Sequence, residues 1–179
     1  MERCRMVFSG SGGQGVITAA IILAETAVLH EGLEAVQTQA YGAAARGGAT
    51  RSDVIIADTP INFPKVIQPN VLVCLTQEAY STFMGIIRPG GLLLTDPRYV
   101  TPQLKVDAVQ REIPMYETVM EKIGKPIVFN ICMLGTIIGL TDLVRSQSIM
   151  KTLETRIPSG FLEMNRKALE LGIALGENA

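Results

Sequence analysis

The sequence contains no tryptophan, a single histidine and few charged side chains. Of its 179 residues 18% are charged and 47% are hydrophobic, whereas an ordinary soluble domain is about 25% charged. This scarcity of charge excludes an intrinsically disordered chain. Sixteen basic residues against 17 acidic ones leave no positive excess to neutralise phosphates, so nucleic acid is not an expected partner. With so little charge to cover the surface, we expect some apolar surface to face another protein.

Apolar runs long enough to cross a bilayer are also missing. The longest, residues 15–29 and 127–140, are interrupted by Glu25 and Asn130 and fall short of the roughly 20 residues that a spanning helix needs. The opening Met-Glu-Arg-Cys-Arg lacks the apolar core and the cleavage site of a signal peptide. The sequence therefore predicts no membrane contact and a cytoplasmic location.

Residues that usually carry catalysis or hold metals are scarce as well. Cys4, Cys74 and Cys132 lie far apart with no C-x-x-C pair, so we expect reduced, mostly buried thiols rather than a zinc site or an iron–sulfur cluster. His30 falls near the end of the first predicted helix, where a cation meets the negative end of the helix dipole. Because the chain also has no nucleophile–base pair and no Walker-type phosphate loop, we expect no catalytic residue and no metal ligand.

Alternating strand and helix patterns in the first hundred residues predict an α/β fold. Strands are expected at residues 5–8, 35–39, 53–57, 71–75 and 91–95. Continuous apolar runs at two of them are typical of a sheet covered on both faces. Helices are expected from Gly15 to about Leu29, with a stop at Gly32, and between the N-cap Thr76 and Pro89. The order predicts a three-layer, mainly parallel sheet with a Rossmann-like first βαβ unit and helices on both faces.

The second half of the chain is expected to be helical and to cover the sheet. Helices are predicted at residues 115–123, 132–143, 149–156 and 160–175. No linker or repeat divides the sequence, so residues 1–179 are expected to form a single domain. The first helix is apolar on nearly every face, which leaves two interpretations open: it is sandwiched within the domain, or its outer face meets a partner chain.

A glycine-rich run, Gly10-Ser11-Gly12-Gly13-Gln14-Gly15, fits G-x-G-x-x-G between a strand and a helix. We call it the glycine loop. Its glycines allow a close backbone approach, and the helix start offers free N–H groups, so a phosphate or carboxylate would be favoured there. A nicotinamide enzyme would also need an acidic residue at the end of the second strand, whereas Glu34 stands at its start. The alternative that the glycines serve only strand–helix packing stays open.

A second glycine-rich segment, residues 41–53, is predicted as a loop between two strands. Because an arginine among glycines can reach a phosphate through two hydrogen bonds, this segment adds binding candidates to the glycine loop. These candidates are Tyr41, Arg46, Gly47, Gly48 and Arg51. The alternative is a surface loop whose arginines pair with Asp53 or Asp58.

Several stretches carry a family resemblance: residues 8–20, 37–42, 45–56, 60–61, 76–80, 89–91 and 130–135. Together they resemble the gamma subunit of 2-oxoacid:ferredoxin oxidoreductases, nearest to the 2-oxoglutarate branch. The resemblance implies a complex that decarboxylates a 2-oxoacid on thiamine diphosphate with magnesium, passes electrons through iron–sulfur clusters to ferredoxin, and forms acyl-CoA. It places these groups on alpha, beta and ferredoxin-like (delta) subunits, the expected partners of this chain.

For this chain we expect a role in assembly and in closing the active site, with the glycine loop and the arginine segment receiving CoA phosphates. Ala43-Ala44-Ala45 stand where relatives often carry an acidic residue before the arginine, so the role of that carboxylate is not transferred. Two other functions stay open: a stand-alone nucleotide-binding oxidoreductase and a purely structural scaffold. The identity of the 2-oxoacid and a homodimer of the isolated chain also stay open.

Overall fold

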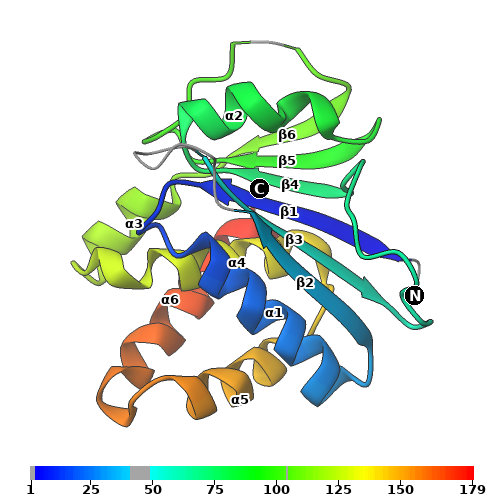
Figure 1. Cartoon of the computed structure of the whole chain (residues 1–179). Helices are drawn as coiled ribbons and strands as arrows, with labels where there is room; N and C mark the ends of the chain where they lie inside the picture. The colour runs from blue at the N-terminus through cyan, green and yellow to red at the C-terminus, as the bar shows by residue number, and fades with distance from the viewer. Residues whose placement is uncertain (1–2, 41–48, 104) are drawn as a thin grey trace.

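The computed structural model describes residues 3–40, 49–103 and 105–179, which build one mixed sheet with helices on both faces (Figure 1). The strands are β1 (Cys4–Gly10), β2 (Glu34–Ala40), β3 (Thr50–Ala57), β4 (Val71–Cys74), β5 (Gly91–Thr95) and β6 (Ala108–Glu112). Their order across the sheet is β2-β3-β1-β4-β5-β6. Neighbours from β1 to β6 are parallel, whereas β3 runs antiparallel to both β1 and β2.

Helices flank the sheet unequally. One face carries α2 (Gln77–Phe83) and the 3-10 turn η1 (Met84–Ile86). The remaining helices lie on the side of the other face, with α5 beyond α1 (Figure 1). They are α1 (Val16–Glu31), α3 (Met115–Lys122), η2 (Pro126–Val128), α4 (Phe129–Thr141), α5 (Ser146–Arg156) and α6 (Ser159–Glu177). The three-layer α/β architecture predicted from the sequence is confirmed.

The central strands carry runs of consecutive apolar residues because both of their faces are buried. On β1, Met6 and Phe8 pack into the core beneath α1 and α4, while Val7 packs into a separate core beneath α2. Neighbouring β3 repeats the alternation, with Val54 on the first face and Ile55 on the second. Each such side chain, fully buried, contributes roughly 1.5–3 kcal/mol. The continuous apolar runs in the sequence therefore reflect two cores rather than one.

Glycines bring α4 and α6 into backbone contact. A Cβ on Gly172 would lie 2.0 Å from the carbonyl oxygen of Cys132, and one on Gly135 would lie 2.3 Å from that of Leu169. Gly139 and Gly176 are equally close to the facing helix. A glycine inside a helix costs about 1 kcal/mol relative to alanine, so these positions are kept small by the close approach of the two helices.

Helix α1 is sandwiched within the fold, which decides between the two interpretations of its apolar surface. It packs on the sheet with one side and on α4 and α5 with the other. Inside the α1–α5 contact, the hydroxyls of Thr26 and Thr152 lie 2.8 Å apart, and at its rim Arg156 pairs with Glu25. Most of the apolar surface of α1 is thus covered within the fold, whereas Val28 and Leu29 near its end are exposed.

Two details differ from the expectation. Strand β3 begins at Thr50 rather than at residue 53 and lies between β1 and β2, so the first βαβ unit is interrupted by an antiparallel strand. Strand β6 was not predicted, because its Ala-Val-Gln-Arg-Glu sequence lies at a half-exposed edge and mixes polar with apolar residues. Among the described residues, no helix is both long and apolar enough to cross a membrane.

Candidate functional site

The glycine loop lies at the edge of the sheet where β1, β4 and β5 all end, which we call the carboxyl edge. It turns the chain from β1 into α1, with φ of +94° at Gly13 and +73° at Gly15. Gly15 is the N-cap of α1, and a Cβ there would lie 2.7 Å from the Cβ of Asn130. Only glycine combines this left-handed backbone with such close packing.

Backbone N–H groups at this turn are open to a ligand. No side chain in the described part of the chain caps α1, and its first turn holds no acidic residue. The N–H groups of Gly12 and Gly13 have no acceptor among the described residues, and both residues are exposed. Because the first N–H groups of a helix have no partner within the helix and carry its positive dipole end, the turn favours an anion.

A pocket of about 300 Å³ adjoins the loop on the α1 face of the sheet. Its wall includes Tyr99, Tyr116 and Phe129, whose rings meet with centroids 5.5–5.8 Å apart. Gly13, Gln14 and Gly15 of the loop line the same pocket. The pocket therefore pairs a polar backbone rim with an aromatic wall.

Asn130 was missed as a site residue by the sequence analysis. Its side chain packs on Gly15, lines the same pocket, and makes no hydrogen bond to another described residue. The signal was present, since Asn130 is the polar interruption of the apolar run 127–140. Its carboxamide adds a hydrogen-bond donor beside the start of α1.

Asp96 holds the backbone of Tyr116, a residue of the aromatic wall, in place. The residue follows β5 and is fully buried, and its carboxylate accepts the backbone N–H of Arg98 and that of Tyr116, each at 2.8 Å. Burial raises the pKa of this carboxyl, and the hydrogen bonds from the backbone oppose the rise. The carboxylate thus ties the end of β5 to the start of α3, on which Tyr116 stands.

Arg51 lies in β3 and not in a loop as the sequence predicted. Its guanidinium bonds both carboxylate oxygens of Asp53, at 2.6 and 2.9 Å, and the carbonyl of Val66, and it sits over the Phe83 ring. This places the charged group on the α2 face, away from the aromatic pocket. The pairing with Asp53 is the alternative that the sequence left open. Tyr41, Arg46, Gly47 and Gly48 lie outside the described residues.

The ends of β2 and β3 nevertheless belong to the carboxyl edge. In the antiparallel pairing Thr50 lies opposite Gly10, and Ala40 lies opposite Arg51. The chain therefore leaves β2 and enters β3 beside the glycine loop. Glu34, the first residue of β2, lies at the opposite edge of the sheet.

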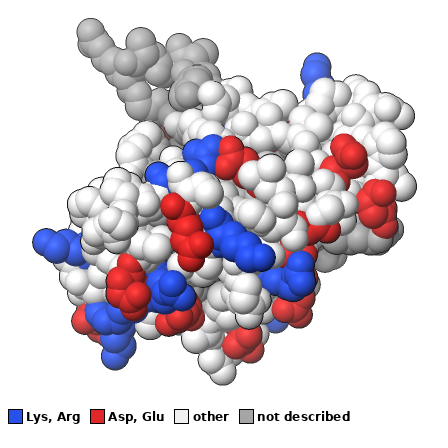
Figure 2. All heavy atoms as spheres, turned by 90° about the horizontal axis from the view of Figure 1, so that it is seen from below, with Lys and Arg blue, Asp and Glu red and all other residues white. Residues whose placement is uncertain are grey.

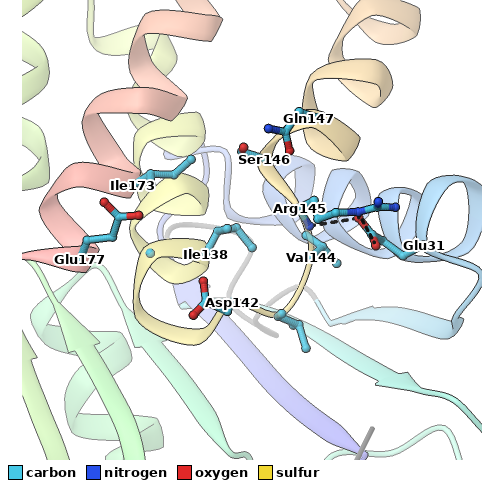
Figure 3. Close-up of a pocket in the computed structure, with 11 residues that line it drawn as sticks. Glu31, Ile138, Asp142, Val144, Arg145, Ser146, Gln147, Ile173 and Glu177 are labelled. Carbon is cyan, nitrogen blue, oxygen red and sulfur yellow. Dashed lines mark hydrogen bonds and ion pairs between the residues drawn. The ribbon is translucent and has the colours of Figure 1, made fainter.

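A second pocket, of about 370 Å³, lies at the far end of α1 and has the opposite electrostatic character (Figure 3). Asp142 and Glu177 face it from the ends of α4 and α6, and Glu31 is held there by Arg145. Burial raises the pKa of Glu31, but hydrogen bonds from Ser148 and Arg145 outweigh it and lower the pKa. Acidic groups at helix C-termini disfavour an anion, so none of the candidate functions falls here.

Charges of both signs are interspersed on the face of α5 and α6 (Figure 2). Arg156 pairs with Glu25 and Arg166 with Glu163. Figure 2 shows no patch of one charge sign on this face, so it offers no continuous positive surface to the phosphates of a nucleic acid. Among the described residues, no group of three or more His, Cys, Asp and Glu side chains could hold a metal ion.

The fold and the site together define an α/β protein whose glycine-rich turn at the carboxyl edge offers an anion-binding site. The family profile described as pyruvate ferredoxin/flavodoxin oxidoreductase matches residues 5–175, and the chain belongs to this family. It is 45% identical over 166 residues to the 2-oxoglutarate synthase subunit KorC of Methanocaldococcus jannaschii, covering 92% of this chain and 89% of that one.

Solved structures agree with this assignment. The gamma subunit of a keto/oxoacid ferredoxin oxidoreductase from Geobacter sulfurreducens superposes with a TM-score of 0.91 at 37% identity, over 100% of this chain and 99% of that one. A 2-oxoglutarate:ferredoxin oxidoreductase from Magnetococcus marinus shares the fold at 21% identity and a TM-score of 0.88, over 100% of this chain and 32% of its own. The resemblance to a gamma subunit and the predicted fold class are confirmed.

Proposed function

We propose that the chain is the gamma subunit of a 2-oxoglutarate:ferredoxin oxidoreductase. Such a complex oxidatively decarboxylates the oxoacid, forms acyl-CoA and CO2, and reduces ferredoxin. The observation that carries the proposal is the 45% identity, over nearly the full length of both chains, to a protein named as a 2-oxoglutarate synthase subunit. Thiamine diphosphate, magnesium and the iron–sulfur clusters are assigned to the alpha, beta and delta partner subunits by the same resemblance.

The chain's own contribution is to receive CoA phosphates at the glycine loop and to close the active site. Open N–H groups of Gly12 and Gly13 and the start of α1 supply donors for a phosphate, and the dipole of α1 stabilises its charge. The carboxamide of Asn130 stands beside them. The aromatic wall of the adjoining pocket offers an apolar surface to the rest of the molecule. Arg46 and Arg51 are proposed to add positive charge at the same edge.

A stand-alone nicotinamide enzyme finds no support in this geometry. Such an enzyme holds the ribose with an acidic residue at the carboxyl end of the strand next to β1. Here β3 occupies that place in the sheet, and Glu34 lies at the opposite edge from the glycine loop. The experiments below distinguish the proposed CoA-binding role from the role of a purely structural scaffold.

The proposal is tested by purifying the chain with its neighbours and assaying the assembled complex. We expect CoA-dependent ferredoxin reduction with 2-oxoglutarate well above that with pyruvate. CoA should also slow hydrogen exchange of the amides of residues 11–18, and leave β6 unaffected. If the complex is active but CoA does not slow hydrogen exchange in the glycine loop, the chain serves as a structural scaffold.

The arginine part of the proposal has its own test. Arg46→Ala and Arg51→Ala should each raise the KM for CoA, because each removes a guanidinium that the proposal assigns to the phosphates. For Arg51 this requires that CoA draws the guanidinium away from Asp53. Arg156→Ala, which removes a surface ion pair on α5 far from the carboxyl edge, is the matched control. Should both loop variants retain the wild-type KM for CoA, the arginines have no part in binding it.

A further inference from the structure

The side chain of Gln14 joins the glycine loop to the neighbouring strand end. Its Oε1 accepts a hydrogen bond from the backbone N–H of Ser11 at 2.8 Å, and its Nε2 donates one to the carbonyl oxygen of Leu75 at 2.8 Å. Ser11 belongs to the same loop, whereas Leu75 directly follows β4. One carboxamide therefore fixes the turn between β1 and α1 (Figure 1) to the carboxyl end of β4.

The loop leaves room for this side chain at Gly10. A Cβ on Gly10 would lie 2.6 Å from Oε1 of Gln14 and 3.3 Å from the Cβ of Leu75, so any larger residue there would displace the carboxamide. Elsewhere in the loop, Gly13 and Gly15 have positive φ angles, and glycine backbone by itself visits many conformations. The bridge through Gln14 selects one of them.

Both polar atoms of Gln14 are used inside the protein, as is the N–H of Ser11. The N–H groups of Gly12 and Gly13 stay without an acceptor in the described part of the chain. We propose that Gln14 is a positioning residue, which holds the glycine loop in the shape that leaves those N–H groups open to a CoA phosphate. This inference rests on the proposed function and deepens it.

The first test compares Gln14→Met with Gln68→Met in the assembled complex. Methionine keeps the length of the side chain and removes both hydrogen bonds, while Gln68 is exposed in the segment between β3 and β4 and serves as the control. We expect Gln14→Met to raise the KM for CoA roughly tenfold with kcat at saturating CoA within about twofold. A wild-type KM for CoA in Gln14→Met would overturn the inference.

A second variant, Gln14→Glu, separates positioning from a general loss of stability. A protonated glutamic acid can donate to Leu75 and accept from Ser11 as the amide does, but the ionised form cannot donate. The ordinary pKa of glutamate is about 4.3. The Leu75 carbonyl favours the protonated form, whereas the Ser11 N–H and the dipole of α1 favour the ionised form. The KM defect of Gln14→Glu should therefore shrink as pH falls, while that of Gln14→Met stays constant relative to wild type. A KM for CoA in Gln14→Glu that stays equally raised at every pH would contradict a positioning role for the two hydrogen bonds of Gln14.

Hydrogen exchange distinguishes failure of this inference from failure of the proposed function. In the wild-type complex without CoA, the Ser11 amide should exchange roughly tenfold more slowly than in Gln14→Met, because only the wild type has its acceptor. Equal rates would overturn the inference whatever CoA does. Absence of CoA protection over residues 11–18 in the wild type would instead overturn the part of the proposed function that places CoA phosphates at the glycine loop.

Discussion

At the scale of the single residue, Gly15 is required both by its backbone and by its neighbour. Gly15 and Gly32, the two caps of α1, share a left-handed backbone with φ of +73° and +66°, but only Gly15 has Asn130 against the place of a Cβ. Gly32→Ala should cost about 1–2 kcal/mol for the left-handed conformation alone. Gly15→Ala should cost clearly more in urea unfolding. Equal losses would show that Asn130 moves aside freely.

Asp96 is expected to make stability depend on pH. Its pKa is raised by burial, so the folded state holds the proton more tightly than the unfolded state, where the pKa is about 3.9. The contribution of this group is then fully present below pH 3.9 and is lost as pH rises through the raised value. We expect the free energy of unfolding of wild type, relative to Asp96→Asn, to fall across that window.

The same substitution has a cost at every pH, because asparagine has one acceptor where Asp96 uses two. Turning an NH2 group toward the N–H of Arg98 or Tyr116 should destabilise the fold by about 1–3 kcal/mol. Asp107→Asn, at an exposed carboxylate, is the control and should change little. A pH dependence that is identical in wild type and Asp96→Asn would rule out this carboxyl as its source.

At this scale, residues could be placed from the sequence where the local sequence alone determines the backbone conformation. The glycine loop was placed correctly because its spacing requires a turn between a strand and a helix. Arg51 was placed in a loop because its neighbours are polar, whereas in the structure its backbone pairs with β1 and β2 and its guanidinium packs over the Phe83 ring, far away in sequence. Asn130 was missed because its contact with Gly15 depends on the packing of α4 beside α1.

At the scale of the element, the α4–α6 contact should tolerate no added methyl group. Gly172→Ala would drive a Cβ to 2.0 Å from the carbonyl of Cys132, so the helices must separate, at an expected cost of about 3 kcal/mol. Gly160→Ala, in the same helix with open space around it, should be neutral or stabilising by up to about 1 kcal/mol. Thermal unfolding of the two variants measures the difference. Similar melting temperatures would contradict the close packing.

The elements were predictable to the extent that local pattern decides them. Apolar runs located β4 and β5 because both faces of these strands are buried, so nearly every residue is apolar. Strand β6 was not predicted because it lies at the edge of the sheet, where half of its positions face solvent. Its strand conformation depends on the pairing with β5. The insertion of β3 between β1 and β2 is a long-range pairing that no local periodicity encodes.

At the scale of the whole molecule, the thiols should report global unfolding. Burial raises the pKa of Cys74 and Cys132 to about 12, and that of Cys4 to about 11. Since the thiolate is the reactive form, a disulfide reagent at pH 8 should react slowly with the folded chain. In denaturant all 3 cysteines should react at once. Rapid reaction of any thiol in the folded chain would show local opening around it.

The placement of β1 has a consequence for biosynthesis. Strand β1 is made before its two partners but lies between them in the sheet, and these partners, β3 and β4, are completed only at residues 57 and 74. Helix α1, made next, has to await α5 before its outer side is covered. A nascent chain on the ribosome therefore carries an unpaired strand and an apolar helix without its cover until most of it has emerged, and surface of this kind is prone to aggregation.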